Sequence, residues 1–379
     1  MSYQSTTEDT EDTEMERIDA AVIGAGVTGL AAALAIAERG PSVCVVERHP
    51  RAGLETSTHN SGVIHAGLYY PTGTLKARLC VEGRRMLYEF CARHNVPHAR
   101  LGKLVVATQP AEIPEIEGLC ARATANGVEG VRIVDQTFIA TREPAVRAIA
   151  ALYSPESGIV SAEDLVRTLL RKAEAHGTIF LPGTTIERVD QNRDGMILHT
   201  AREAILARTV VNAAGLYADD VSRLLGGESF TIYPCRGEYA ELAPAKRSLI
   251  NGPVYPLPHH KGHSLGVHLT KSTGGNVWIG PTVRFQDRKD DYENDREPLE
   301  GFLEPTRRLL PSITLDDLRL SGSGIRAKLH PPSESFADFL IRRDRQNPAV
   351  VQAAGIDSPG LTSCLAIGKL VADIVTADD

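Results

Sequence analysis

Polar and histidine-containing residues that suit proton transfer gather in one short stretch of this sequence, residues 59–70. The stretch reads HNSGVIHAGLYY, with two histidines six positions apart and two glycines that permit close backbone approach. A neutral histidine can take a proton near pH 7, which makes His65 a candidate base. A flexible surface loop is the alternative, but the apolar residues within the stretch argue against simple solvation. Because long ordered loops are usually functional, we expect residues 51–70 to line a site.

A nucleotide-binding pattern lies just upstream. An apolar strand is followed by GAGVTG at 24–29, then by an alanine-rich helix and a second strand that ends at Glu47. Gly24 permits the tight turn, Gly26 lets the backbone approach a pyrophosphate, and Gly29 packs the helix on the strand. The helix amides face the phosphates, and Glu47 accepts hydrogen bonds from ribose hydroxyls. This order predicts a dinucleotide site but does not separate FAD from NAD.

Two later segments also suit close contact with a ligand. A β-rich strand ends in Ala213, Ala214 and Gly215, whose small size lets the backbone approach a ligand. Near the C-terminus, AAGIDSPGLT at 353–362 opens a final helix, with Pro359 well placed at its start. The free amides of such a helix start stabilise an anion, for example the N1–C2=O edge of a reduced flavin.

The second half of the chain adds candidates for substrate binding. His268 lies between two apolar residues on an expected strand, either as a pocket base or as a satisfied core histidine. Arg236 and Arg326 suit bidentate binding of carboxylates, and Lys328 suits a point charge. For each of these cations the alternative is a structural or surface ion pair.

The cysteines and the remaining histidines do not indicate a metal site. His259, His260 and His263 have no companion cysteine or paired carboxylate at ligand spacing, so we expect a solvated turn and no metal. No two cysteines form a C-x-x-C pair, which favours free and mostly buried thiols in a reducing compartment. The six are Cys44, Cys80, Cys91, Cys120, Cys235 and Cys364.

Composition places the chain among ordinary soluble enzymes. Its 379 residues are 42% hydrophobic and 23% charged, enough for about two domains. Most of the net charge of -7 comes from the acidic first sixteen residues, which we expect to be a disordered tail and not a signal peptide. No apolar run reaches the roughly 18 residues that span a bilayer. No basic block suggests nucleic acid as a partner.

The pattern of apolar residues predicts the elements that position these groups. An antiparallel sheet with frequent Pro and Gly is expected over 230–283. Helices are expected over 30–38, 74–94, 111–126, 161–176, 298–310 and 359–372.

Taken together, the motifs resemble the L-2-hydroxyglutarate oxidase/dehydrogenase family. That family belongs to the FAD-dependent oxidoreductases related to D-amino-acid oxidase and aerobic glycerol-3-phosphate dehydrogenase. The resemblance covers nearly the whole chain after the tail, and the combination is much more specific than any single motif. It rests on residues 17–47, HNSGVIHAGLYY at 59–70, VNAAG at 211–215, RGEY at 236–239, LGVH at 265–268, SGIR at 323–326 and GIDSPGLT at 355–362.

The resemblance implies a non-covalent FAD. The ADP part is expected at 24–29 and Glu47, the flavin along 59–63, the phosphate side at 213–215 and the pyrimidine edge at 355–362. The full set of expected FAD contacts is Gly24, Gly26, Gly29, Glu47, Arg48, Thr58, His59, Asn60, Ser61, Gly62, Val63, Ile186 (a backbone contact to adenine), Ala213, Ala214, Gly215, Gly355, Ser358, Gly360, Leu361 and Thr362.

The implied fold is α/β, with a discontinuous Rossmann-like FAD-binding domain and an antiparallel-sheet α+β substrate domain. After the tail at 1–16, we expect the FAD-binding domain to comprise residues 17–95, 150–228 and 325–379. The substrate domain is expected to comprise residues 96–149 and 229–324.

The implied function is oxidation of a 2-hydroxy acid, with L-2-hydroxyglutarate to 2-oxoglutarate as the best candidate. A histidine base, His65 or His268, would take the hydroxyl proton while hydride passes to the flavin, and Arg236, Arg326 and Lys328 would bind carboxylates. The first alternative is an FAD-dependent oxidase or dehydrogenase of an α-amino acid or secondary amine. The remote alternative is a dinucleotide-binding module without catalysis.

Two segments depart from the usual family pattern, and both lie in the expected substrate domain. They are PLPHHKGH at 256–263 and GPTV at 280–283, where GPNA is common. These departures bear on the identity of the substrate more than on cofactor or fold. The electron acceptor stays open between oxygen, a quinone and a soluble carrier. We expect a cytoplasmic protein, with peripheral attachment to the inner membrane face as an option.

Overall fold

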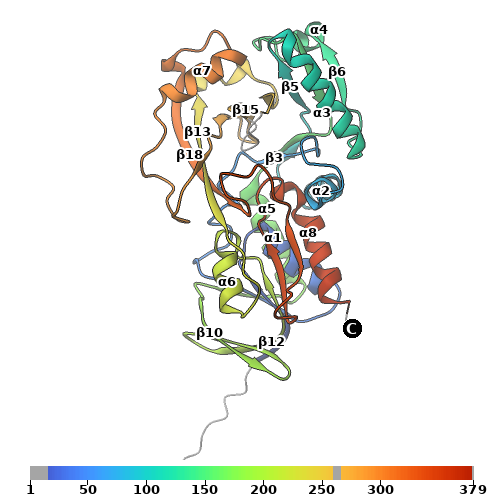
Figure 1. Cartoon of the computed structure of the whole chain (residues 1–379), viewed down its shortest axis with the longest axis vertical. Helices are drawn as coiled ribbons and strands as arrows, with labels where there is room; N and C mark the ends of the chain where they lie inside the picture. The colour runs from blue at the N-terminus through green and yellow to red at the C-terminus, as the bar shows by residue number, and fades with distance from the viewer. Residues whose placement is uncertain (1–15, 259–265, 378–379) are drawn as a thin grey trace, which may run out of the picture.

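The computed structural model describes residues 16–258 and 266–377, which form two lobes (Figure 1). An eight-stranded sheet organises the lower lobe in that view, and a nine-stranded sheet organises the upper one. A third sheet of three short strands, β3 (Val63–Ile64), β8 (Gly158–Val160) and β4 (His98–Ala99), carries part of the loop that follows the nucleotide motif. The predicted α/β class, with a largely parallel nucleotide sheet and a largely antiparallel second sheet, is confirmed.

Parallel strands make the centre of the eight-stranded sheet. Strands β9, β2, β1, β12 and β20 all run parallel, while the β10–β11 hairpin and β19 pair antiparallel at its margins. The strands are β1 (Glu16–Ile23), β2 (Val43–Glu47), β9 (Ile179–Pro182), β10 (Ile186–Asn192), β11 (Gly195–Thr200), β12 (Ala204–Asn212), β19 (Leu340–Arg343) and β20 (Val350–Ala354).

Helix α1 (Val27–Ala37) follows β1 directly and is the most buried helix of this lobe's core. Ten of its eleven residues are buried, as expected for a helix that is apolar all round. It packs between α5 (Ala162–Ala175) and α8 (Gly360–Val375). The contact with α8 is close, because a Cβ on Gly368 would lie 2.4 Å from the Ala31 carbonyl oxygen. This packing fixes the start of α8 relative to the nucleotide motif.

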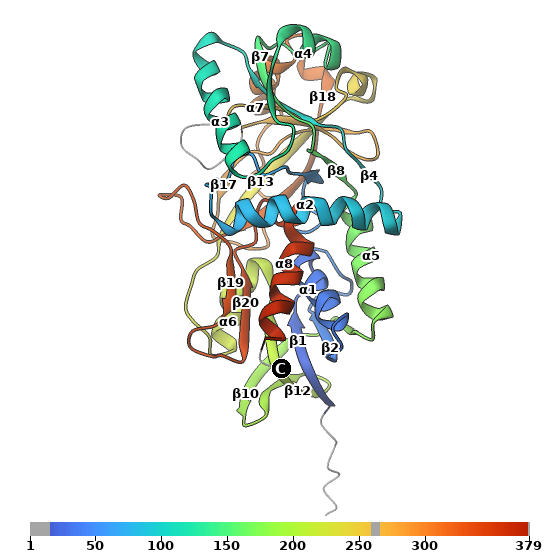
Figure 2. The ribbon, with the colours of Figure 1, turned by 90° about the vertical axis from the view of Figure 1, so that its right-hand side faces the viewer.

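Helix α2 (Leu75–His94) crosses the molecule between the two lobes, as Figure 2 shows. The Thr74 hydroxyl caps its start by accepting from the Ala77 amide, and Asn95 ends it in the left-handed region at φ 56°. Gly83 lets α2 lie directly on α8, since a Cβ there would be 2.7 Å from the Thr362 carbonyl oxygen. The predicted helix over 74–94 is confirmed.

The upper lobe is built on the nine-stranded sheet. Its strands pair antiparallel except for β14 and β5, which are parallel. Helices α3 (Ile113–Ala125), α4 (Gln136–Arg142) and α7 (Glu300–Leu309) belong to this lobe, and the short α6 (Ala218–Leu224) to the other (Figure 1). The strands are β5 (Lys103–Ala107), β6 (Arg132–Asp135), β7 (Ala150–Ser154), β13 (Tyr233–Leu242), β14 (Val254–Pro256), β15 (His268–Lys271), β16 (Val277–Gly280), β17 (Arg284–Phe285) and β18 (Leu318–Lys328).

Two of the expected domain boundaries need correction. Strand β7 was expected in the FAD-binding domain, but it pairs with β5 and β6 in the nine-stranded sheet. Strand β18 pairs with β13 along its whole length and therefore crosses the boundary expected at residue 325. We propose boundaries near 155 and 328, because a strand belongs to the sheet that satisfies its backbone hydrogen bonds. Within the described ranges, none of the helices combines the length and apolarity that a membrane crossing requires.

Candidate functional site

One cavity of about 1040 Å³ is lined by residues from both lobes. One end lies at the turn between β1 and α1, where Gly24, Gly26 and Glu47 line it. The other end lies against the nine-stranded sheet, where His268 and Arg326 line it. The nucleotide motif and the expected substrate residues therefore share one cavity.

The turn between β1 and α1 admits no side chain at two of its three glycines. Gly24 has φ +104°, and a Cβ there would lie 2.6 Å from the Ala213 carbonyl oxygen. A Cβ on Gly29 would lie 1.9 Å from the Gly24 carbonyl oxygen, so helix and turn touch backbone to backbone. This is the geometry that brings the amides of α1 to a pyrophosphate.

The acid and the cation after β2 are held in place at the cavity wall. The buried Glu47 carboxylate accepts from the Ala25 amide (2.8 Å) and the His49 amide (2.9 Å), with lone pairs left for ribose hydroxyls. The Arg48 guanidinium lies 3.6 Å from the ring centre of Tyr217. Ile186, at the start of β10, lines the same end. These residues fit the ADP part of FAD.

The loop after Glu47 is fastened by its own polar side chains. Asn60 donates to the carbonyls of Thr56 (3.1 Å) and Ser57 (2.8 Å) and accepts from the Gly62 amide (2.9 Å). His59, Asn60, Ser61 and Val63 line the cavity as expected.

Five of the expected FAD contacts do not line the cavity, and the structure gives each another place; the fifth, Thr362, is described below. Thr58 donates to the Gly53 carbonyl (2.5 Å), so its hydroxyl is already used. Gly62 and Gly355 have φ of +65° and +66°, and a Cβ on Gly355 would strike the Leu329 side chain. Gly29 likewise acts through packing. We propose that these positions shape the backbone behind the cavity wall, and their expected contacts with FAD stay predictions.

Thr362 joins the two segments that were expected to meet at the flavin. Its buried hydroxyl accepts from the His65 amide (2.9 Å) and donates to the Val63 carbonyl (3.3 Å). Thr362 itself does not line the cavity, whereas Ser358, Gly360 and Leu361 at the start of α8 do. No side chain caps that helix start. Its amides are thus available to an anionic cofactor edge.

Both candidate histidines line the cavity and are held neutral. Burial, with smaller contributions from Lys103 and His268, puts the pKa of His65 well below its usual value. Burial lowers the pKa of His268 to about 3, against the opposing effect of its hydrogen bond to Gly266. That bond (2.9 Å) uses Nδ1–H as the donor, because a carbonyl can only accept. The lone pair of His268 is therefore on Nε2.

The two expected arginines lie on opposite faces of the β13–β18 pair. Arg326 is paired in register with Cys235, and Arg236 with Ile325, so the pleat directs the two guanidinium groups apart. Arg326 lines the cavity, and no carboxylate of the described chain forms an ion pair with it.

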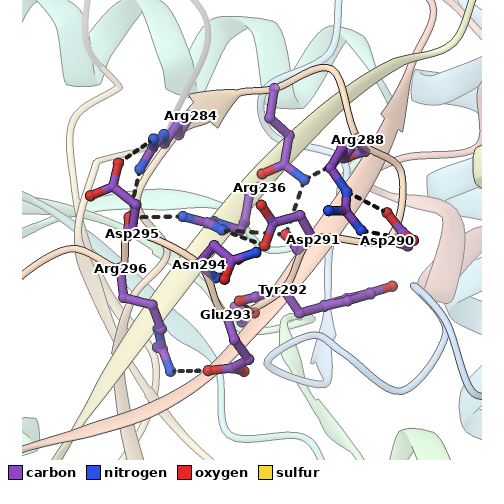
Figure 3. Close-up of polar contacts among 12 residues, drawn as sticks. Arg236, Arg284, Arg288, Asp290, Asp291, Tyr292, Glu293, Asn294, Asp295 and Arg296 are labelled. Carbon is purple, nitrogen blue, oxygen red and sulfur yellow. Dashed lines mark hydrogen bonds and ion pairs between the residues drawn. The ribbon is translucent and has the colours of Figure 1, made fainter.

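Arg236 does not reach the cavity, which corrects its expected role in binding a substrate carboxylate. It is 1% exposed and pairs with Glu238 (2.9 Å) and Asp291 (3.5 Å). It also donates to the Asp295 carbonyl (3.1 Å). Figure 3 shows Arg236 directed into the charged segment 284–296. Its function is to anchor that segment to β13.

Lys328 lines the cavity but is not a free charge. Its ammonium lies 3.2 Å from Asp357 Oδ2, and Lys76 lies 2.6 Å from Oδ1 of the same carboxylate. Burial alone would raise the pKa of Asp357, yet the two lysines outweigh burial and hold it below its usual value. The cluster therefore leaves one positive charge in excess at the wall beside α8.

Several wall residues escaped the sequence analysis. Tyr239 lies on the face of β13 opposite to Arg236 and Glu238, and that face lines the cavity. Because successive side chains of a strand point to opposite faces, the sequence could have predicted this. The Ser57 hydroxyl accepts from the Val27 amide (3.0 Å) at the start of α1. The missed lining residues are Lys76, Tyr239 and Tyr255, whereas Ser57, Tyr69, Tyr70 and Asp357 lie in the segments 51–70 and 355–362 that were expected to line the site.

Metal-binding geometry does not occur in the part of the chain that the structure describes, since no three His, Cys, Asp or Glu side chains there group around a common point. His259, His260 and His263, which the sequence analysis assigned to a solvated turn, lie outside the described residues.

Comparison with known proteins gives a consistent result. The family model for FAD dependent oxidoreductases matches residues 19–374. L-2-hydroxyglutarate dehydrogenase from Arabidopsis thaliana is 35% identical over 94% of this chain and 83% of its own length. The enzyme of the same name from Bos taurus is 32% identical (94% and 88%), and that from Indibacter alkaliphilus 30% identical (93% and 97%).

Solved structures agree on the fold. L-alpha-glycerophosphate oxidase from Mycoplasma pneumoniae, with FAD bound, superimposes with a TM-score of 0.87 at 24% identity and 95% coverage of both chains. Glycine oxidase from Geobacillus kaustophilus gives 0.82 at 23% identity, over 96% of this chain and 95% of its own. With the matched family model, the dehydrogenase relatives and a cavity whose glycines and acid fit FAD, the chain belongs to the FAD-dependent oxidoreductase family and groups with its L-2-hydroxyglutarate dehydrogenases.

Proposed function

We propose that this protein oxidises an L-2-hydroxy dicarboxylic acid, with L-2-hydroxyglutarate to 2-oxoglutarate as the reaction. The observation that carries the proposal is one cavity that combines an FAD-compatible end with Arg326 and two neutral histidines. The printed names of the curated relatives support the choice of substrate.

Each wall residue has a defined part in this proposal. When bound, FAD supplies the acceptor for the two electrons and the hydrogen that leave the substrate carbon. Arg326 binds the carboxylate next to the reacting carbon and fixes its orientation. His268 Nε2 takes the hydroxyl proton, because its tautomer already presents a lone pair. His65 holds the same end of the cavity through its amide bond to Thr362.

The Lys76–Asp357–Lys328 cluster lies at the cavity wall beside the start of α8. Its excess positive charge, next to the uncapped start of α8, favours a bound anion at that wall. Lys328 is thus proposed to act as a fixed charge near the cofactor and not to bind the substrate carboxylate.

The test is a spectrum of the purified protein before and after anaerobic addition of L-2-hydroxyglutarate. A yellow protein that bleaches supports flavin, substrate and direction of transfer together. A yellow protein that stays yellow refutes this substrate and directs the test to α-amino acids and secondary amines, whose oxidation releases ammonia or an aldehyde. A protein that stays colourless with added FAD would overturn the proposal.

Readmission of air to the bleached protein then distinguishes the electron acceptors. Rapid return of the colour makes oxygen competent, and slow return favours a quinone or a soluble carrier. The cytoplasmic location and the peripheral membrane attachment expected from the sequence stay predictions.

A further inference from the structure

Lys103 is a buried cation that the proposed reaction does not use. It opens β5, is 1% exposed, and its ammonium has no hydrogen-bond partner among the residues that the structure describes. A buried charge is costly unless it is paired, and a native protein keeps one mainly where it has a use. The question is therefore which negative group it attracts.

The surroundings of Lys103 include residues of the substrate end of the cavity. Its ammonium lies 4.4 Å from the ring centre of Tyr255 and 4.7 Å from that of Tyr69, and both tyrosines line the cavity. The Tyr69 hydroxyl and His65 Nδ1 are also buried without a hydrogen-bond partner in the described chain. Buried polar atoms are normally satisfied, so three such atoms beside one cavity indicate a polar ligand there.

The other cations of the cavity wall are already engaged or exposed. Lys76 and Lys328 share Asp357, and the proposed function assigns their one excess charge to the cofactor wall beside α8; Arg48 pairs with Glu55 at the nucleotide end. Arg122 lines the cavity, but its side chain is exposed to solvent, where screening weakens its attraction.

We propose that Lys103 is a specificity-determining residue that supplies the positive charge for the second carboxylate of a dicarboxylate substrate. The inference rests on the proposed function, in which Arg326 binds the first carboxylate. Lys103 does not itself line the cavity, so it acts as a charge behind the rings of Tyr69 and Tyr255. The Lys103 charge acts across the two tyrosine rings because the protein interior screens a charge less than bulk water does.

The titration of Lys103 gives this role a signature. Burial lowers its pKa to about 7, so binding of an anion nearby would raise the pKa and take up a proton. The groups that face it do not titrate between pH 7 and 9. Burial lowers the pKa of His65 and His268 below this range, and it raises the pKa of Cys80 to about 12 and those of Tyr69 and Tyr255 above their usual values.

The experiment compares glutarate with pentanoate, which share five carbons but differ by one carboxylate. Binding to the FAD-loaded protein is followed by the shift of flavin absorbance, so no turnover is needed. Lys103→Met should weaken glutarate at least tenfold and change pentanoate less than twofold, and Lys103→Arg should restore most of the difference. Lys271→Met removes a lysine from the same sheet, where it donates to the Ile250 carbonyl, and should leave both affinities unchanged.

Two results would overturn the proposal. One is an equal loss of both ligands in Lys103→Met, which would mark a merely structural role. The other is loss of the preference for glutarate in Arg122→Met but not in Lys103→Met, which would assign the second carboxylate to the exposed arginine.

A measurement on the unmodified protein covers the case in which Lys103→Met does not fold. The glutarate affinity, relative to that of pentanoate, should fall up to tenfold per unit as pH rises from 7 to 9, and calorimetry in two buffers should detect proton uptake on binding. A ratio independent of pH would refute the proposal. Failure of L-2-hydroxyglutarate to bleach the flavin would instead refute the proposed function, while this ratio could still be measured.

Discussion

The two ends of the cavity are built in different ways. At the nucleotide end, the backbone of one continuous segment makes the site: Gly24, Gly29 and Glu47 lie within 24 residues and meet through a turn, a helix and two adjacent strands. At the substrate end, side chains arrive from separate strands, with His268 from β15 and Arg326 from β18. The first end depends on local backbone geometry, and the second on register and packing between distant segments.

The largest effect is expected from a side chain at the nucleotide end. Gly29→Val would place a Cβ 1.9 Å from the Gly24 carbonyl oxygen and must displace α1 from β1. We expect loss of bound FAD and of several kcal/mol of stability, beyond the roughly 1–3 kcal/mol of ordinary overpacking. The flavin spectrum and the melting temperature measure both. Gly322→Val, at an exposed position with open space, is the matched control, and equal behaviour of the two variants would contradict the argument.

The two arginines of the β13–β18 pair separate stability from substrate binding. Arg236→Met removes the closer of the two arginines that pair with buried Glu238, while Arg296 stays 3.2 Å from the other carboxylate oxygen, so we expect a loss of unfolding free energy of at most about 3–5 kcal/mol. Arg326→Met should keep the fold and the flavin but lower kcat/KM by roughly 30-fold to 1000-fold, as loss of a charge-assisted bond of about 2–4 kcal/mol predicts. Denaturant titration and steady-state kinetics test the pair. A normal kcat/KM in Arg326→Met would remove this residue from the site.

A smaller effect is expected from Thr362, whose hydroxyl connects the loop at residues 63–65 to the start of α8. Thr362→Val leaves the buried His65 amide without its acceptor, at a cost of about 1–3 kcal/mol. Because that amide holds the loop against α8, FAD affinity should fall with stability. Thr376→Val, just after the far end of the same helix, removes a half-buried hydroxyl that Arg39 contacts and should cost much less. Equal melting temperatures of the two variants would show that the hydrogen bond from the His65 amide to Thr362 does not stabilise the fold.

The smallest effect is a dependence of stability on pH. His268 stays neutral in the folded protein down to about pH 3, whereas the unfolded chain binds its proton below about 6.5. The unfolded state therefore binds more protons between these values, and stability falls as pH falls, by at most about 1.4 kcal/mol per unit for this group. Denaturant titrations between pH 7 and 5 should show a shallower slope in His268→Gln. An unchanged slope would mean that the buried ring does protonate.

The substrate end shows why some expectations were wrong. Arg236 and Arg326 have the same chemistry, and each follows a strand pattern, yet only the register of β13 against β18 puts them on opposite faces. Lys103 could not be identified from the sequence. Its proposed role depends on the burial of its ammonium and on the lack of a hydrogen-bond partner within the described chain, and both are properties of the tertiary structure. The boundary at 150 failed for a related reason, since β7 finds its backbone partners in β5 and β6.

The sequence by itself determined the nucleotide end, the α/β class and the family resemblance. A Gly-rich turn, a buried helix and an acid at the end of the next strand are local features, and their steric requirements can be read over about 30 residues. Only the tertiary structure decided which cations face the cavity, which tautomer His268 adopts and that Thr362 fastens the loop to α8. Those properties depend on the direction, burial and partners of side chains that are distant in the chain, and no spacing along the sequence fixes them.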